Sequence, residues 1–208
     1  MMQRVAQNPR SVWTPGDFVD LAVRDAVDKT LQRLARSGEL RRIERGLYDK
    51  PSFNSLTDSE TVPDYRAVIE AVARRDKARF VIDGMTAANE LGLTTAVPAK
   101  IEVLVDARLK TISFGNQKIV FKYAAPSRLF WAGRPAMSIV QALHWMQDVM
   151  NNKEERAKVK RAIEALLASG DKGNALAVDL REGLSALPIW MQEFLRKPLE
   201  LSRQDIDP

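Results

Sequence analysis

Apolar residues recur at helical spacing in one short stretch near the N-terminus. Val27, Leu31 and Leu34 stand at i, i+4 and i+7, a spacing that places them on one face of an α-helix. We expect this helix to begin near Arg24 and to end at Ser37-Gly38, because glycine readily adopts the left-handed conformation that closes a helix. The pattern therefore predicts an amphipathic helix with one face in a core.

A shorter helix is predicted just before it. Thr14 is a suitable N-cap, Pro15 suits the first helical position, and Asp17 stands three residues after the cap. The apolar face of this helix is predicted to consist of Phe18, Leu21 and Ala22. Residues 1–12 leave room for only one or two further helical turns, because Pro9 interrupts them.

A hairpin is predicted after the amphipathic helix. Glu44-Arg45-Gly46 is a plausible tight turn, and Leu47-Tyr48 follows as a returning strand. Two short helices, a glycine turn and a basic hairpin, in that order, predict a winged helix-turn-helix domain at residues 1–50.

The charge of this stretch favours nucleic acid as a partner. Seven cations and three acids lie between Lys29 and Lys50. A helix fits the major groove, where Arg, Lys and Gln side chains read base edges, and a basic hairpin suits phosphates or the minor groove. The alternative is an ordinary solvated helix and hairpin. The predicted DNA-binding residues are Asp25, Lys29, Gln32, Arg33, Arg36, Arg41, Arg42, Arg45 and Tyr48.

The chain changes character after residue 50. Residues 51–63 are bracketed by proline, rich in Ser and Thr, and without helical or strand periodicity, which predicts a linker. A helix follows at 64–75, with Asp64 as its cap and with Arg74, Arg75, Lys77 and Arg79 at its end, where cations suit the helix dipole. We therefore expect a linker at 51–63 and a second domain at 64–208.

The second domain is predicted to combine strands and helices. Strands are expected at 80–82, 100–106, 111–114 and 118–123, with a hairpin turn at Gly115-Asn116, and Ile119, Phe121 and Tyr123 on one face of the last strand. Helices are expected at 86–91, 135–149, 153–168 (capped by Asn152), 175–181 and 187–195, with a frayed tail after Lys197. The predicted fold class is α+β: a winged helix-turn-helix followed by a larger domain with a small, mostly antiparallel sheet.

Candidate catalytic chemistry is sparse. The sequence has no cysteine and a single histidine, His144, beside Trp145 in an apolar helix. Asp83, Glu102 and Asp106, with Lys100 or Lys110, loosely resemble a nuclease cluster, but the order of lysine and glutamate departs from that pattern. Tyr123 and Trp131, near Lys122, Arg128 and Arg134, could stack bases or simply be core aromatics. We predict no enzyme activity, no cofactor and no metal.

Composition sets the remaining bounds. A formal net charge of +5 permits nucleic acid as a partner without requiring it. No apolar run reaches membrane-spanning length, and the N-terminus lacks the core of a signal peptide. We expect a cytoplasmic protein.

The same residues also carry a family resemblance. The runs TPGDFVDL and AVDKTLQRLARSGELRRIERGLYDKP resemble the N-terminal winged helix of AbiEi-type antitoxins of bacterial type IV toxin–antitoxin systems. The similarity continues through FVIDGMTAANELGLTTAVPAKIEVLVDA, FKYAAPSRLFWAGRPAMSIVQALHWM and LPIWMQEFLRK. Two features depart from the family pattern: the first helix is short, and Val23 stands where a small polar cap usually opens the recognition helix.

The resemblance implies an antitoxin that represses its own operon. Its winged helix is expected to bind inverted repeats in double-stranded promoter DNA, and its C-terminal domain to counteract a nucleotidyltransferase-like toxin without an assigned contact surface. Two alternatives stay open: a transcription factor whose C-terminal domain binds an effector in a deep apolar pocket, and a nucleic-acid enzyme with converging carboxylates.

Overall fold

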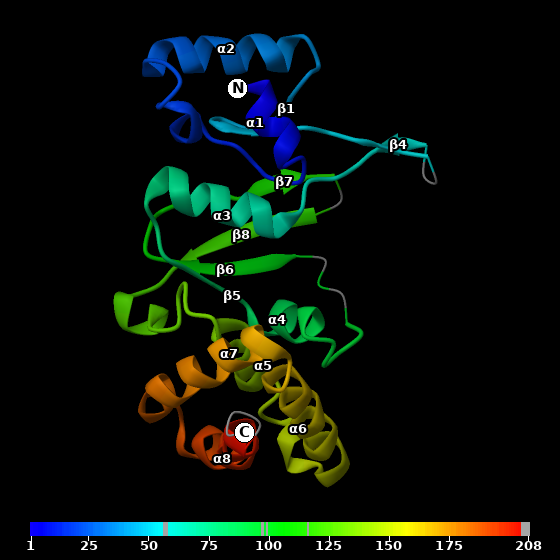
Figure 1. Cartoon of the computed structure of the whole chain (residues 1–208), viewed down its shortest axis with the longest axis vertical. Coiled ribbons are helices and arrows are strands. Elements are labelled where there is room, and N and C mark those ends of the chain that lie inside the picture. Colours follow the sequence, from blue (N-terminus) through cyan, green and yellow to red (C-terminus); the bar gives the residue numbers. More distant parts are fainter. Residues whose placement is uncertain (56–57, 97, 99, 116, 205–208) are drawn as a thin grey trace. The chain divides into compact units, whose positions relative to one another are not determined.

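The structure is a computed structural model that describes residues 1–55, 58–96, 98, 100–115 and 117–204 (Figure 1). By packing, the chain divides into two compact units. The first comprises Met1–Arg79 with Val105–Tyr123, and the second comprises Phe80–Leu104 with the chain from Ala124 onward. These units do not coincide with the predicted division at 50 and 64, because residues 64–79 and 105–123 pack with the N-terminal segment. Independently folding domains at 1–50 and 64–208 stay a prediction.

The first unit begins with three short helices and a hairpin. These elements are α1 (Met2–Gln7), the 3-10 helix η1 (Pro15–Phe18), α2 (Arg24–Arg36), β1 (Arg41–Glu44) and β2 (Leu47–Asp49). Helix α2 begins at the predicted residue, and Gly38 after it has a φ of +77°. The three stripe residues Val27, Leu31 and Leu34 are buried. The amphipathic helix is therefore confirmed.

The capped turn at Thr14 is confirmed, but its helix is shorter than predicted. The Thr14 backbone N–H donates to Asp17 Oδ2 at 2.7 Å, and the Thr14 hydroxyl donates to the same oxygen at 3.0 Å. The helix ends at Phe18, which is fully buried, whereas Leu21 and Ala22 are exposed. The prediction that all three share a buried face is wrong, because the helix ends at Phe18 and the other two residues lie beyond it.

Helix α1 packs on the core despite its six residues. Val5 is fully buried in the cluster that contains Phe18 and Leu31. Arg4 of the same helix donates to the Asp17 carbonyl oxygen at 2.5 Å and to both carboxylate oxygens of Asp20 at 2.9 and 2.6 Å. One apolar residue and one arginine thus attach this short helix to the core.

The predicted linker at 51–63 contains a second hairpin. Strands β3 (Phe53–Asn54) and β4 (Ser59–Glu60) pair antiparallel, with Phe53 opposite Glu60 (Figure 1). At the base of this hairpin, the Ser52 backbone N–H donates to the Thr61 hydroxyl at 3.2 Å. The segment predicted as a linker therefore contains two paired strands, although its sequence shows no strand period.

Two further elements complete the first unit. Helix α3 (Tyr65–Asp76) is capped by Asp64, as predicted, and buries Val68, Ile69 and Val72. Strands β7 (Ile112–Phe114) and β8 (Gln117–Tyr123) pair antiparallel, which confirms the predicted hairpin; Asn116 of its predicted turn lies outside the described residues. Tyr123 is 65% exposed although Ile119, on the same predicted face, is buried.

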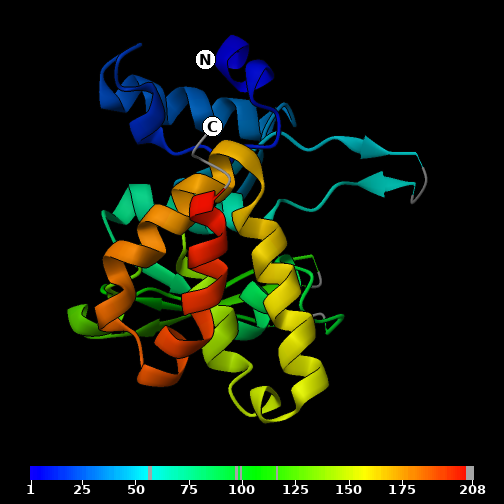
Figure 2. The ribbon, with the colours of Figure 1, turned by 60° about the horizontal axis from the view of Figure 1, so that its bottom comes forward.

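The second unit contains two short strands and a set of helices. Its elements are β5 (Phe80–Ile82), α4 (Gly84–Glu90), β6 (Ile101–Val105), η2 (Pro126–Leu129), α5 (Met137–Trp145), η3 (Val149–Asn151), α6 (Lys153–Leu167), α7 (Gly170–Gly183), η4 (Leu184–Ala186) and α8 (Ile189–Gln204). Strands β5 and β6 are neighbours in a sheet. Helices α6, α7 and α8 contact one another (Figure 2, yellow to red).

Helix α4 lies directly against α5. A Cβ added at Gly84 would stand 2.4 Å from both the Gln141 carbonyl oxygen and Trp145 Cβ, far inside van der Waals contact. Glycine at the first residue of α4 therefore permits the backbones of the two helices to approach closely.

The C-terminal helices differ in length from the prediction. Helix α6 has its predicted cap, since Asn152 Oδ1 accepts from the Glu154 and Glu155 N–H groups. Helix α7 begins earlier than residue 175, and α8 continues through Pro198 to Gln204 rather than fraying after Lys197. Arg181 Nη2 holds this last segment by donating to the Leu199 carbonyl at 2.9 Å and to the Ser202 hydroxyl at 2.7 Å.

The protein is thus α+β, with small sheets and a predominance of helix. The pairs β1–β2, β3–β4 and β7–β8 are all antiparallel. Among the described residues, none of the helices combines the length and the apolar character that crossing a membrane requires.

The packing of α2 predicts unequal effects of substituting two neighbouring residues. Leu31→Ala should lower the free energy of unfolding by about 2–5 kcal/mol, because it removes a fully buried side chain and leaves a cavity. Gln32→Ala, at an exposed position, should change it by less than about 0.5 kcal/mol. Chemical denaturation of both variants measures the difference, and equal effects would mean that α2 is rotated about its axis.

Candidate nucleic-acid interface

Helix α2 presents a polar face opposite its buried stripe. Lys29, Gln32, Arg33 and Arg36 are all exposed, as is Asp25 in the first turn. Among the described residues, Lys29, Arg33 and Arg36 form no ion pair, whereas Arg24 pairs with Asp28 one turn on at 3.1 Å. The structure therefore brings the five predicted helix residues to the surface of one element, with three cations unpaired.

The start of α2 lacks a side-chain cap. Val23 occupies the N-cap position, is 77% exposed, and its side chain accepts no hydrogen bond. Asp25 lies in the first turn, where its negative charge interacts favourably with the positive end of the helix dipole. With Val23 at the N-cap, α2 nevertheless begins at Arg24, as predicted.

The β1–β2 hairpin carries the remaining predicted contacts. Its register pairs Arg41 with Asp49 and Arg42 with Tyr48, and shifts between Arg42 and Glu44. Gly46 has a φ of +74°, which the turn requires and which most residues avoid. Arg42 and Arg45 are exposed, and Arg42 Nε donates to the Glu44 carbonyl in a long hydrogen bond of 3.4 Å.

Arg41 forms more hydrogen bonds within the protein. It donates to both carboxylate oxygens of Asp49 at 3.0 and 2.5 Å and to the Thr61 carbonyl at 2.8 Å. A weaker contact joins it to Glu60 at 3.5 Å. The prediction of Arg41 as a DNA contact is corrected here: its guanidinium satisfies a carboxylate whose side chain is only 8% exposed.

Tyr48 is likewise a core residue. Its side chain is 4% exposed and belongs to the cluster of Trp13, Phe18 and Leu31. Its backbone pairs with Trp13 through bonds of 2.7 and 2.9 Å. The prediction of Tyr48 as a DNA contact is therefore wrong, because β2 is buried along its whole length.

Two arginines that the sequence indicated only as dipole partners contact this region. Arg74 of α3 donates to the Val12 carbonyl at 2.9 Å and to Asp17 Oδ1 at 3.3 Å. Arg75 donates to the Arg45 carbonyl at 2.7 Å and contacts Glu44 Oε2 at 3.4 Å. The pKa of the Arg75 guanidinium lies above its usual value, chiefly because the Asp76 carboxylate accepts hydrogen bonds from it.

The sequence holds no local signal for these contacts. The partners are separated by 30 residues or more in the chain, so helical or strand periodicity cannot relate them. Covariation between partner positions is the kind of signal that could have found them.

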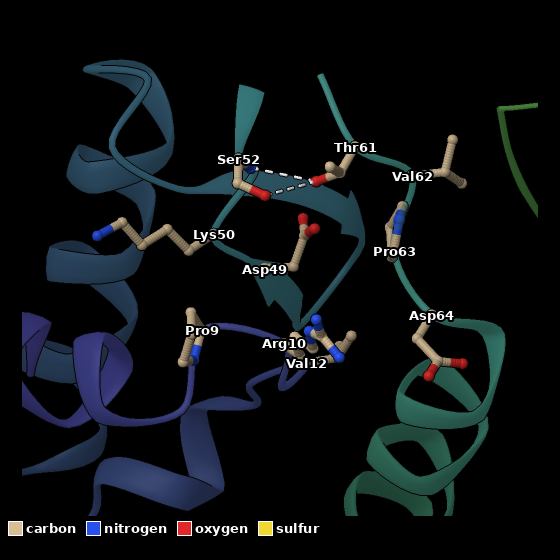
Figure 3. A pocket seen from close by; sticks show the side chains of 10 residues that line it. All are labelled: Pro9, Arg10, Val12, Asp49, Lys50, Ser52, Thr61, Val62, Pro63 and Asp64. Carbon is tan, nitrogen blue, oxygen red and sulfur yellow. Dashed lines mark hydrogen bonds between the residues drawn. The ribbon is translucent and has the colours of Figure 1, made fainter. Parts of the chain in front are cut away.

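A hollow of about 370 Å³ lies beside the hairpin, lined by Pro9, Arg10, Val12, Asp49, Lys50, Ser52, Thr61, Val62, Pro63 and Asp64 (Figure 3). Ser52 and Thr61 are hydrogen-bonded to each other across it, and Lys50 extends away from it. The one buried carboxylate, Asp49, is already held by Arg41. The hollow therefore offers no pair of groups arranged for proton transfer or nucleophilic attack.

The hollows described in the second unit are open and have charged residues in their linings. One, of about 410 Å³, is formed by Pro135, Asp171, Asn174, Ala175, Val178, Asp179 and Glu182. Another, of about 260 Å³, is formed by Glu193, Arg196, Lys197, Glu200 and Leu201. Neither is the deep apolar pocket that an effector-sensing domain would be expected to have.

The acidic residues that resembled a nuclease cluster have structural partners. Asp83 caps α4 by accepting from the Thr86 N–H and hydroxyl at 3.0 and 2.6 Å, and it also accepts from the Glu102 N–H at 3.1 Å. Hydrogen bonds from Arg79 lower the pKa of the Asp106 carboxyl. Within the described ranges, no three His, Cys, Asp or Glu residues are grouped so as to hold a metal ion.

The remaining candidates separate into core and surface. Trp131 is 6% exposed, and the Arg134 guanidinium stands 4.9 Å from its ring centroid while pairing with Asp179 at 2.8 Å. His144 lies on the exposed side of α5. Trp131 is thus a packing residue, and Arg134 forms an ion pair with Asp179.

The described geometry defines an α+β protein with an exposed, unpaired basic helix face as its main candidate binding surface. The chain belongs to the family described as "Family of unknown function (DUF6088)", which matches residues 2–174. A search of curated proteins found no match.

The contrast between Arg41 and Arg42 predicts opposite phenotypes for neighbouring residues. Arg41→Ala should lower the free energy of unfolding by about 1–3 kcal/mol, because the nearly buried Asp49 carboxylate loses its partner. Arg42→Ala, at an exposed position, should leave stability within about 0.5 kcal/mol. Thermal unfolding of the two variants provides the test, and a stable Arg41→Ala protein would contradict the structural role.

Proposed function

We propose that this protein binds double-stranded DNA through α2 and the β1–β2 hairpin, and that it is an antitoxin that represses its own operon. The order α1, η1, α2, β1, β2 is that of a short helix, a helix-turn-helix and a wing. The first unit would thus act as a winged helix-turn-helix domain, with α2 as its recognition helix. Such a function is exercised in the cytoplasm.

One observation carries the DNA-binding proposal: the unpaired polar face of α2. The 13-residue helix has its apolar stripe in the core, so its opposite face must point outward. That face displays Lys29, Gln32 and Arg33, which are side chains able to donate to purine edges. B-DNA offers a major groove about 12 Å wide, which admits a helix of this kind.

The hairpin is proposed to contact the DNA backbone. Arg42 and Arg45 are exposed cations on a short two-stranded element, and arginine forms strong hydrogen bonds with phosphate oxygens. Asp25 is proposed to lie at the start of the recognition helix, where its carboxylate can accept from a cytosine amino group.

The antitoxin part of the proposal is supported by the resemblance to AbiEi-type proteins across most of the chain. Its operator would be inverted repeats in the promoter of its own operon. Its functional counterpart would be a nucleotidyltransferase-like toxin, for which we propose no contact surface on this chain.

The two roles within the interface are separable by titration. Gln32→Ala and Arg33→Ala should each weaken operator binding by about 1–3 kcal/mol and relax the preference at one or two base pairs. Arg42→Ala and Arg45→Ala should weaken binding to all sequences alike and reduce the slope of log affinity against log salt by about 1 per lost phosphate contact. Mobility shifts on duplexes from the protein's own promoter, at several salt concentrations, measure both quantities.

A charge-matched control is available in the second unit. Arg161→Ala, at an exposed position of α6, removes one cation that lies outside the proposed interface, and it should leave affinity and salt slope unchanged. If Arg161→Ala weakens binding as much as Arg33→Ala does, binding reflects overall charge and the proposed interface is wrong.

The antitoxin role predicts rescue from toxicity. Co-expression with a nucleotidyltransferase encoded beside this gene should restore growth of cells that the toxin alone arrests. Arg33→Ala should retain this rescue while losing repression of a promoter reporter, because α2 is proposed to serve DNA binding only. Failure of the wild-type chain to rescue growth, at confirmed expression, would contradict the antitoxin role and leave the DNA-binding proposal to the mobility shifts.

A further inference from the structure

Helix α3 ends in two consecutive arginines that contact different parts of the first unit. Arg74 reaches the segment before η1, through the Val12 carbonyl and the Asp17 carboxylate. Arg75 reaches the turn of the β1–β2 hairpin, through the Arg45 carbonyl and Glu44. Helix α3 thus contacts the proposed DNA-binding segment both before η1 and at the hairpin turn, through two adjacent arginines.

The contact of Arg75 with the turn is specific in its geometry. Nη1 donates to the Arg45 carbonyl at 2.7 Å, while Nε and Nη2 are held by Asp76 at 3.1 and 2.7 Å. The side chain is 24% exposed. A Cβ added at Gly46 would stand 3.5 Å from Arg75 Cδ, so the stem of the arginine lies against the turn while its head donates to the turn's backbone.

The hairpin needs such support to keep one orientation. Its strands are four and three residues long, and a register shift interrupts them between Arg42 and Glu44. Two-stranded hairpins are marginal in water without further packing. Strand β2 is buried and therefore fixed, but the turn that carries the exposed Arg45 side chain depends on what contacts it from α3.

We infer that Arg75 is a positioning residue, which holds the hairpin turn so that Arg45 and Arg42 reach the DNA backbone, and that the DNA-binding module therefore includes α3. The inference rests on the proposed function. Arg75 acts through the Arg45 carbonyl and makes no contact with DNA, so its effect must disappear when the hairpin arginines are absent.

A double-mutant cycle tests this dependence in the full-length chain. Arg75→Ala should weaken binding to promoter duplex by about 3- to 10-fold, within the range of substitutions that act through a neighbour, and should lower the salt slope. In the Arg45→Ala, Arg42→Ala background, the same substitution should change neither affinity nor slope. Arg75→Lys should recover part of the loss, because a single ammonium can still donate to the Arg45 carbonyl.

Arg74→Ala is the matched control for stability. It removes contacts of the same kind from the same helix end, but from the η1 segment rather than the hairpin. Both alanine variants should unfold at lower temperature, and titrations are carried out well below either transition. Only Arg75→Ala should lower the salt slope, since only it releases phosphate-contacting residues.

Three results overturn the inference. The first is a loss from Arg75→Ala that adds fully to that of the hairpin variants. The second is an equal drop in salt slope for Arg74→Ala. The third is an unchanged affinity for Arg75→Ala while Arg33→Ala still weakens binding. This result rejects the positioning role of Arg75 but keeps the proposed interface. If Arg33→Ala and the hairpin variants also bind like the wild type, the proposed function fails together with the inference.

Discussion

The Asp17 carboxylate joins segments of the first unit that are far apart in sequence. One oxygen accepts from the Thr14 N–H and hydroxyl, and the Arg74 guanidinium approaches both oxygens. The carbonyl of the same residue accepts from Arg4 of α1. Charge-assisted hydrogen bonds of this kind are about twice as strong as neutral ones. Because α1, η1 and α3 all meet at Asp17, the placement of Phe18 in the core depends on it.

The core in turn dictates what α2 can display. Three apolar residues at i, i+4 and i+7 fix the rotation of the helix, so Lys29, Arg33 and Arg36 must share the outward side. Like charges three or four residues apart destabilise a helix by about 0.2–0.5 kcal/mol per pair. The exposed face therefore costs the helix some stability, which binding to a polyanion would offset by bringing counter-charge to each cation.

The elements that the sequence predicted are those whose signals are local. The stripe of α2, the caps at Thr14, Asp64 and Asn152, and the β7–β8 hairpin each depend on residues within a few positions of one another. Two of the errors arose where distant partners contribute. Residues 198–204 continue α8, where Arg181 donates to the Leu199 carbonyl and the Ser202 hydroxyl. Strands β3 and β4 pair next to the hydrogen bond between Ser52 and Thr61.

In the candidate site, too, local signals and distant partners decide different things, here for single side chains. Arg41 and Arg42 are chemically identical and adjacent, but successive residues of a strand point to opposite faces. Their surroundings differ accordingly: Arg41 stands opposite Asp49 in the register and binds its carboxylate, whereas Arg42 stands opposite Tyr48 and is exposed. The alternation of a strand could have excluded one of the two from the predicted contacts. It could not have said which, because the carboxylate that binds Arg41 belongs to Asp49, eight residues away on the returning strand.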